Sequence, residues 1–224
     1  MMTQDEYIKQ FNEDDAVGWD CIDNKLKEIY GDQEPRHYGT LIKYRFGGRD
    51  PLDGISIYDQ NEPVFHRHIV SYGMSELYYN PEQAGEKFSK WGFEFTFRVV
   101  PYLEDEEYND AEHEPMWAAY IMQHLARIVF EDNKPFKPYF FFEGGAINDE
   151  TKISGVAFVI DPVLGKIDTP HGEVIFLQMV GLTQKELDWL WEDPNSNRCE
   201  ELINKMRVDN LMLITDLNRT KEYV

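Results

Sequence analysis

The sequence predicts an α+β fold with a mixed, largely antiparallel β-sheet and flanking helices. Short strand patterns occur before and after one long amphipathic helix, and they do not alternate regularly with helices as they would in a doubly wound fold. The chain has 224 residues, of which 42% are hydrophobic and 14% aromatic, which is enough to bury one core. We expect residues 1–15 to form an N-terminal extension and residues 16–224 to form a single domain.

The first predicted element is a helix over residues 16–30. Its apolar residues recur at helical spacing and are Trp19, Ile22, Leu26, Ile29 and Tyr30. Asp14 and Asp15 are candidates for its N-cap, and Gly31 provides a C-terminal stop. The first dozen residues of the chain are expected to fray or to add a turn.

Three strands follow in the prediction, over residues 40–46, 55–58 and 64–72. The first carries Leu41, Tyr44 and Phe46 among polar neighbours. The sequence Gly-Gly-Arg-Asp-Pro at residues 47–51 predicts a turn between the first two strands. Residues 80–89 contain a proline and a glycine and are predicted to be a surface loop.

Residues 91–130 are predicted to be the centre of the fold. Phenylalanines 93, 95 and 97 alternate with polar residues, which is the period of a strand with one buried face. Pro115 opens a helix whose apolar residues, Trp117, Ile121, Leu125, Ile128 and Val129, lie on one face. Between strand and helix, residues 102–114 form an acidic loop that is expected to be solvated.

The C-terminal part is predicted to return to strands and then to short helices. Residues 139–142 read as a short aromatic strand, and residues 155–160 and 174–180 as a hairpin-like pair of apolar strands. A capping box at residues 183–186 opens a helix that continues to residue 191. A further helix over 198–206 and a late strand over 211–215 complete the prediction.

The net charge of −20 excludes several classes of function. Such a chain repels phosphate backbones and anionic lipid, so we expect neither nucleic acid nor a membrane as partner. The surplus carboxylates keep a protein soluble, or they attract a cationic partner such as a basic protein or peptide. No apolar run spans a membrane, the N-terminus does not resemble a secretory signal, and the two cysteines form no motif, so the cytoplasm is the expected location.

No catalytic motif occurs in the sequence, and no cofactor is expected. A strand would direct His66 and His68 to one face, where they could share a metal ion with Asp50 or Asp53. His171 lies in a turn and could activate a nucleophile. A metal-dependent or hydrolytic enzyme that uses the three histidines is therefore one alternative; the other interpretation is that each histidine is hydrogen-bonded within the fold.

Tyr78 and Tyr79 precede a predicted loop, and tyrosines in such positions are candidate anchors for a protein partner.

Several segments together resemble the suppressor of fused family. Residues 47–56, GGRDPLDGIS, resemble the family's GGxDPLDxxS, and residues 68–78, HIVSYGMSELY, resemble HYxSxGLSxLY. Residues 91–98 resemble GFELTFR, and residues 117–130 resemble WxxxLLQxLARYVF. Further matches follow in order at residues 161–162, 167–174, 176–183 and 213–216.

This resemblance implies a non-enzymatic α+β binding domain similar to the N-terminal domain of suppressor of fused. Eukaryotic members hold Gli-type transcription factors through a peptide that adds as a strand in a cleft between two domains. Tyr78 matches a tyrosine that contacts this peptide, and Glu82 or Glu86 could take the part of its acidic partner. The second domain of that cleft has no counterpart in the sequence, and Arg67 replaces an aromatic residue of the family.

Bacterial single-domain members are associated with toxin loci, where they resemble immunity proteins. We therefore expect a bacterial antitoxin that neutralises a cognate basic toxin through an acidic surface, with Glu104, Asp105, Glu106 and Glu107 as candidate contacts. The second expectation is a peptide-binding adaptor that accepts an extended strand beside Tyr78.

Overall fold

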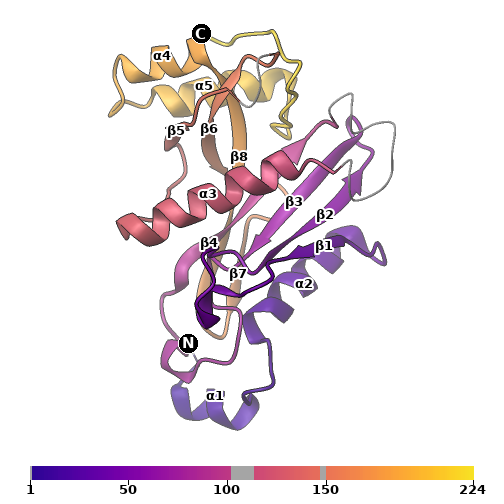
Figure 1. Cartoon of the computed structure of the whole chain (residues 1–224), viewed down its shortest axis with the longest axis vertical. Coiled ribbons are helices and arrows are strands. Elements are labelled where there is room, and N and C mark those ends of the chain that lie inside the picture. The colour runs from indigo at the N-terminus through magenta and orange to yellow at the C-terminus, as the bar shows by residue number, and fades with distance from the viewer. Residues whose placement is uncertain (1, 102–113, 147–149) are drawn as a thin grey trace.

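The computed structural model describes residues 2–101, 114–146 and 150–224. In this part of the chain, one mixed sheet of eight strands organises the fold, as the sequence predicts (Figure 1). The strands are β1 (Arg36–Gly39), β2 (Gly54–Gln60), β3 (His66–Tyr72), β4 (Phe88–Val99), β5 (Phe141–Glu143), β6 (Ile153–Ile160), β7 (Lys166–Thr169) and β8 (Gly172–Thr183). Their order is β1-β2-β3-β4-β8-β6-β5, and β7 pairs with β8 beside this path.

One parallel pairing joins the two halves of the sheet. Strands β1 to β4 form an antiparallel meander, and β5, β6, β7 and β8 pair with one another in antiparallel fashion. Between them, β4 and β8 run parallel, with Phe97 opposite Met179. The predicted hairpin-like pair corresponds to β6 and β8, and the short strand β7 lies between them in sequence.

Helices cover both faces of the sheet. The helices are α1 (Gln4–Gln10), α2 (Val17–Tyr30), α3 (Met116–Asp132), α4 (Gln184–Trp191) and α5 (Arg198–Asp209). Helix α3 buries its apolar side on the face formed by the odd-numbered residues of β4 and by β2, β3, β6 and β8. On the opposite face, α2 packs against β2, β3 and β8, whereas α4 and α5 pack against β6 and β8 (Figure 1).

The second face of β4 is also buried, which the alternation did not predict. Glu94, Thr96 and Arg98 are each at most 1% exposed, and they meet polar side chains from β3 and from the turn after β6. Buried charges of this kind persist only when they are paired and hydrogen-bonded. Strand β4 is therefore apolar on one face and carries a buried polar cluster, with Arg98 paired to Asp161, on the other.

Four predicted elements differ from the structure. Residues 40–46 are not a strand: β1 ends at Gly39, and the 3₁₀ helix η1 (Tyr44–Phe46) follows. The predicted loop at 80–89 contains the 3₁₀ helix η2 (Pro81–Gln83) and the beginning of β4. Residues 211–215 contribute only a single bridge between Thr215 and Val99 instead of a strand. The predicted short strand over 139–142 lies two residues later, as β5.

The N-terminal residues form a helix rather than a frayed end. A capping box between Thr3 and Glu6 begins α1, and Tyr7 is fully buried. The N-cap of α2 is Ala16 and not an aspartate, because Asp15 bonds to Asn12 instead. Among the described helices, none is long and apolar enough to cross a membrane.

Candidate protein-interaction surface

Tyr78 lies in the segment between β3 and β4, and a buried carboxylate fixes the beginning of this segment. Glu94 is fully buried and accepts hydrogen bonds from the backbone N–H groups of Gly73 (3.0 Å) and Ser75 (2.9 Å). The hydroxyls of Ser71 and Ser75 donate to the same carboxylate, each at 2.6 Å. Because a buried carboxyl group requires hydrogen-bond partners, the chain after β3 is held against β4.

The N-terminus of α2 docks on the same segment. The backbone N–H groups of Gly18 and Trp19 donate to the carbonyl oxygen of Leu77, at 3.0 and 3.2 Å. A Cβ atom at position 18 would lie 1.9 Å from the carbonyl oxygen of Glu76, so only glycine permits this approach. Tyr78 is thus positioned from two sides, by β4 and by α2.

The side chain of Tyr78 joins a cluster of opposite charges. Its hydroxyl donates to a carboxylate oxygen of Asp53 and accepts from the Lys43 ammonium, which lies 3.5 Å from that carboxylate. The guanidinium of Arg45 lies over the Tyr78 ring, 3.6 Å from its centroid. Burial raises the pKa of Tyr78, and the hydrogen bond to Asp53 and its charge add to this effect, so the phenol remains a donor at neutral pH.

The loop beside Tyr78 exposes large apolar side chains. Leu41 is 104% exposed, Phe46 71%, Ile42 62% and Tyr44 43%. The loop is nevertheless compact, because the N–H of Gly48 donates to the carbonyl oxygen of Lys43. Exposed apolar side chains gathered on an ordered loop are typical of interaction sites. We call these four residues, together with Lys43, Arg45, Asp53 and Tyr78, the Tyr78 surface.

An edge strand lies next to this surface. Within the described residues, β1 pairs only with β2, so alternate N–H and C=O groups of β1 point away from the sheet. The chain passes directly from Gly39 into the exposed loop, and Thr40 is held by the carbonyl oxygen of Asp53 (2.9 Å). An edge of this kind is where an extended segment can add to a sheet as a further strand.

The other predicted contact residues that the structure describes, Glu82 and Glu86, form no hydrogen bond with Tyr78. Glu82 lies in η2 and Glu86 follows it, and both are exposed. The Tyr78 hydroxyl donates to Asp53, and the Tyr78 backbone N–H donates to Glu76 (3.5 Å), so the roles of Glu82 and Glu86 stay predictions. Glu104, Asp105, Glu106 and Glu107 lie outside the described residues.

His66 and His68 share one face of β3, as their spacing predicts, but Asp50 and Asp53 are not beside them. Both rings are fully buried, and His68 has Asp161 (3.0 Å from its Nε2) and the Tyr30 hydroxyl as neighbours. Asp50 pairs with Arg127 instead, and Asp53 belongs to the Tyr78 surface. The proposed metal set is therefore not assembled. Burial, followed by the charge of Arg98, lowers the pKa of His68 to about 4, so the ring is neutral.

His171 lies apart from this pair, in the turn between β7 and β8. Its Nδ1 donates to the carbonyl oxygen of Glu76 (3.2 Å), and its Nε2 accepts from the hydroxyl of Tyr7 (2.6 Å). One ring nitrogen therefore holds the Glu76 segment and the other holds α1, and burial lowers the pKa of the ring. Across the described part of the chain, no three side chains of the histidine, cysteine or acidic type are grouped so that they could hold a metal ion.

Lys43, Arg45 and Asp53 belong to the site but were not predicted as contacts of Tyr78. Their contacts join residues 25 or more positions apart in the sequence, so no local pattern reveals them. One signal was present: two basic residues alternate with four large apolar residues at positions 41–46, in a chain of net charge −20. Because we interpreted this stretch as a strand, we did not predict it as a contact surface.

Comparison with known proteins identifies a family. The sequence model described as "Suppressor of fused protein (SUFU)" matches residues 48–220. The human protein "Suppressor of fused homolog" is 33% identical over 218 residues, which cover 90% of this chain and 43% of the human one. The chain thus spans less than half the length of this curated relative.

Solved structures extend the comparison. The structure described as "the Sufu-Fu complex crystal structure" superposes with a TM-score of 0.80 and 27% identity, over 93% of each chain. A putative SUFU homolog from Neisseria gonorrhoeae has a TM-score of 0.61 at 14% identity, over 92% of this chain and 97% of that one. The second likeness concerns the fold alone.

Proposed function

The chain belongs to the suppressor of fused family, and from this premise we propose that it is a non-enzymatic protein-binding domain that neutralises a cognate basic toxin in the bacterial cytoplasm. The observation that carries the binding role is the Tyr78 surface, where an ordered loop exposes four large apolar side chains beside a tyrosine and an edge strand. One family relative is described as a complex with Fu, which is consistent with a binding role.

The charge of the chain supports the finer part of this proposal. A net charge of −20 attracts a cationic partner and speeds its encounter. A toxin that acts on nucleic acid needs a basic surface, and an acidic protein that covers this surface blocks the substrate. Glu82, Glu86 and the acidic loop with Glu104, Asp105, Glu106 and Glu107 are proposed as further contacts.

The test is binding to the protein encoded directly upstream of this chain. We expect tight association by isothermal titration calorimetry, weaker at 500 mM than at 50 mM salt. Tyr78→Ala should weaken it by about tenfold or more, as expected for a buried aromatic anchor. Tyr120→Ala is the matched control, because Tyr120 is a tyrosine on α3 that is 69% exposed. Equal losses in the two variants would contradict the role of Tyr78.

Charge reversal tests the acidic loop separately. Replacing residues 104–107 with lysine should reduce both the affinity and its salt dependence if the loop contacts the partner. An unchanged dissociation constant would remove the loop from the proposal and leave the Tyr78 surface in place.

A second candidate function is a peptide-binding adaptor, and it is favoured by the edge of β1 that pairs with no other strand of the described residues. In this case the partner is an extended segment that adds a strand to the sheet. Hydrogen exchange distinguishes the two: strand addition protects the outward-facing amides of His37 and Gly39 when the partner binds, whereas a contact limited to side chains does not.

A further inference from the structure

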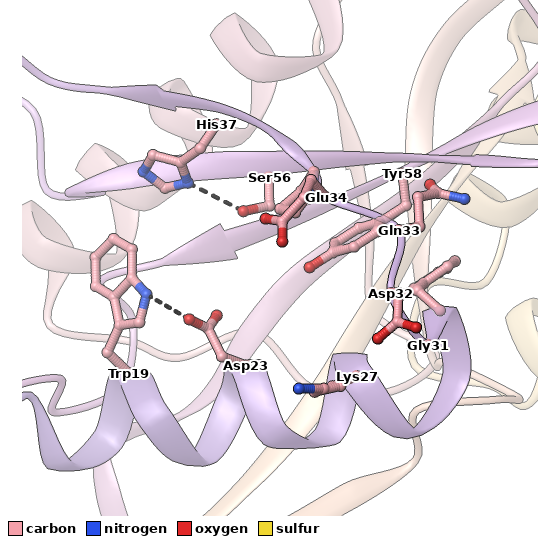
Figure 2. Close-up of a pocket in the computed structure, with 12 residues that line it drawn as sticks. Trp19, Asp23, Lys27, Gly31, Asp32, Gln33, Glu34, His37, Ser56 and Tyr58 are labelled. Carbon is pink, nitrogen blue, oxygen red and sulfur yellow. Dashed lines mark hydrogen bonds between the residues drawn. The ribbon is translucent and has the colours of Figure 1, made fainter.

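A pocket of about 280 Å³ opens between α2, the turn after it, and strands β1 and β2 (Figure 2). None of the functions discussed above uses it. Its aromatic lining comes from three elements: Trp19 and Tyr30 of α2, His37 of β1 and Tyr58 of β2. Trp19 is fixed by stacking on Tyr72, with ring centroids 4.3 Å apart, and Tyr58 by stacking on Tyr30 at 4.1 Å. The aromatic walls are therefore rigid.

The rim of the pocket is acidic. Asp23 lies on α2, and Asp32 and Glu34 lie on the turn that follows this helix (Figure 2). Asp23 accepts hydrogen bonds only from neutral donors, the Trp19 indole (3.1 Å) and the Tyr72 hydroxyl (2.8 Å). Within the described part of the chain, no lysine or arginine forms an ion pair with these three carboxylates. Lys27 is the only lysine or arginine among the described residues that line the pocket.

The pKa shifts of the lining groups are consistent with a net negative charge, since three carboxylates face one lining lysine. Burial raises the pKa of Asp23, and the charge of Asp20 adds to this shift. Burial is also the largest cause that raises the pKa of Tyr58 to about 12, and the charges of Asp23 and Glu34 contribute. Burial lowers the pKa of His37, so this ring is neutral near pH 7 and adds no positive charge to the pocket.

We propose that this pocket binds the guanidinium group of an arginine presented by the partner. Flat aromatic rings and unpaired carboxylates are the two surfaces that a guanidinium contacts best, through stacking and charge-assisted hydrogen bonds. A chain of net charge −20 draws such a group toward the surface. The proposal rests on the proposed protein-binding function and adds the chemistry of one partner residue.

The sheet edge explains how the arginine would arrive. His37 is in β1 and lines the pocket, whereas its neighbour Tyr38 packs on the α3 face of the sheet. A segment paired with β1 therefore directs every second side chain to the pocket side, at intervals of about 7 Å. The Lys43 ammonium lies 5.9 Å from the Trp19 ring and 4.7 Å from the Tyr78 ring, so the pocket continues the Tyr78 surface.

The test uses nuclear magnetic resonance titration of the ¹⁵N-labelled chain with acetyl-Val-Thr-Arg-Thr-Val-amide. The probes are the amides of β1 and the indole N–H of Trp19, which is identified by its absence in Trp19→Phe. We expect saturable shifts of both probes with the arginine peptide. The same peptide with citrulline, which has the shape of arginine without its charge, should bind at least about fivefold more weakly.

Two double variants complete the experiment. Asp32→Asn with Glu34→Gln removes two rim charges on an exposed turn and should weaken the arginine peptide by about fivefold. Glu200→Gln with Glu201→Gln makes the same change of net charge on the exposed side of α5 and should leave binding unchanged. Equal binding of arginine and citrulline peptides, or equal effects of the two double variants, would overturn the proposal. Equal binding of a lysine peptide would overturn the assignment to guanidinium.

The peptide titration and the test of the proposed function can fail independently of each other. If the upstream protein binds in a Tyr78-dependent manner but the arginine peptide does not shift the pocket, only the pocket proposal fails. If the peptide binds in the pocket but the upstream protein does not associate, the antitoxin role fails and the pocket stands.

Discussion

Asp161→Asn should destabilise the fold strongly, because it leaves the buried Arg98 charge without its counterion. Arg98 is 1% exposed, and its guanidinium donates to both carboxylate oxygens of Asp161, at 3.1 and 3.2 Å. Burial alone would raise the pKa of Asp161, but His68 and Arg98 outweigh it and hold the pKa well below its ordinary value. The carboxylate is therefore charged at neutral pH.

The size of the effect follows from these contacts. Asparagine keeps the volume of aspartate, and one side-chain oxygen can still accept the N–H groups of Val163 (2.8 Å) and Leu164 (2.9 Å). No cavity forms, so the loss is that of the buried charge pair together with the hydrogen bond from the Thr96 hydroxyl (3.0 Å), about 3–5 kcal/mol. If unfolding in urea has a slope of about 3 kcal/mol per molar, the midpoint should fall by about 1 M or more.

The assay is urea denaturation followed by circular dichroism at pH 7.5, in a double-mutant cycle with Arg98→Met. In the Arg98→Met background no buried cation remains, so Asp161→Asn should cost less than half of its effect in the wild type. A loss below about 1 kcal/mol in the wild type, or the same loss in both backgrounds, would refute the reasoning.

The remaining predictions concern pH, the N-terminal helix and one glycine. The folded-state pKa of His68 is lowered from 6.5 to about 4, so its contribution to the free energy of unfolding is complete above pH 6.5 and falls by about 3 kcal/mol as the pH drops toward 4. Urea denaturation of the wild type and of His68→Gln at several pH values should show this difference, and parallel stability curves would contradict it. Tyr7→Phe removes the buried hydroxyl that bonds the β7–β8 turn, so amide exchange in α1 should accelerate while that in α3 stays unchanged. Gly18→Ala should lower the melting temperature although alanine favours helices, because its Cβ would lie 1.9 Å from the carbonyl oxygen of Glu76. Asn24→Ala, on the exposed side of α2, is the control and should raise the melting temperature slightly; a higher melting temperature for both variants would show that the Glu76 segment moves away.

Elements with a strong period were predictable from the sequence. The odd residues of β4 and the apolar face of α3 meet in one core, as their spacing of two and of three to four residues indicates. The capping box at Thr183 fixed the start of α4 in the prediction, and the structure has the helix from Gln184. These features depend on local sequence, so they could be found locally.

The errors arise where local pattern and environment disagree. Leu41 and Phe46 suggested a buried strand, yet both lie in a surface loop and are exposed. Glu94 and Arg98 looked like the solvent face of a strand, yet both are buried. Their partners Ser75 and Asp161 are 19 and 63 positions away, and no pattern within one segment reveals such a pair.

The candidate site was predictable in part for the same reason. Tyr78 was predicted as a contact from the family resemblance and from its position before a loop, and its role stays a prediction. The contacts that hold it, from Asp53, Lys43 and Arg45, bring together separate segments, and only the folded chain unites them.

The parallel pairing of β4 with β8 has a consequence during synthesis of the chain. Roughly 80 residues separate Phe97 from its partner Met179, which a ribosome takes about 4–16 s to translate. Throughout this interval the β1–β4 meander presents a phenylalanine-rich strand with one bare edge, the kind of template on which nascent chains aggregate. We therefore expect chains truncated before β8 to require a holdase chaperone, whereas the complete chain does not.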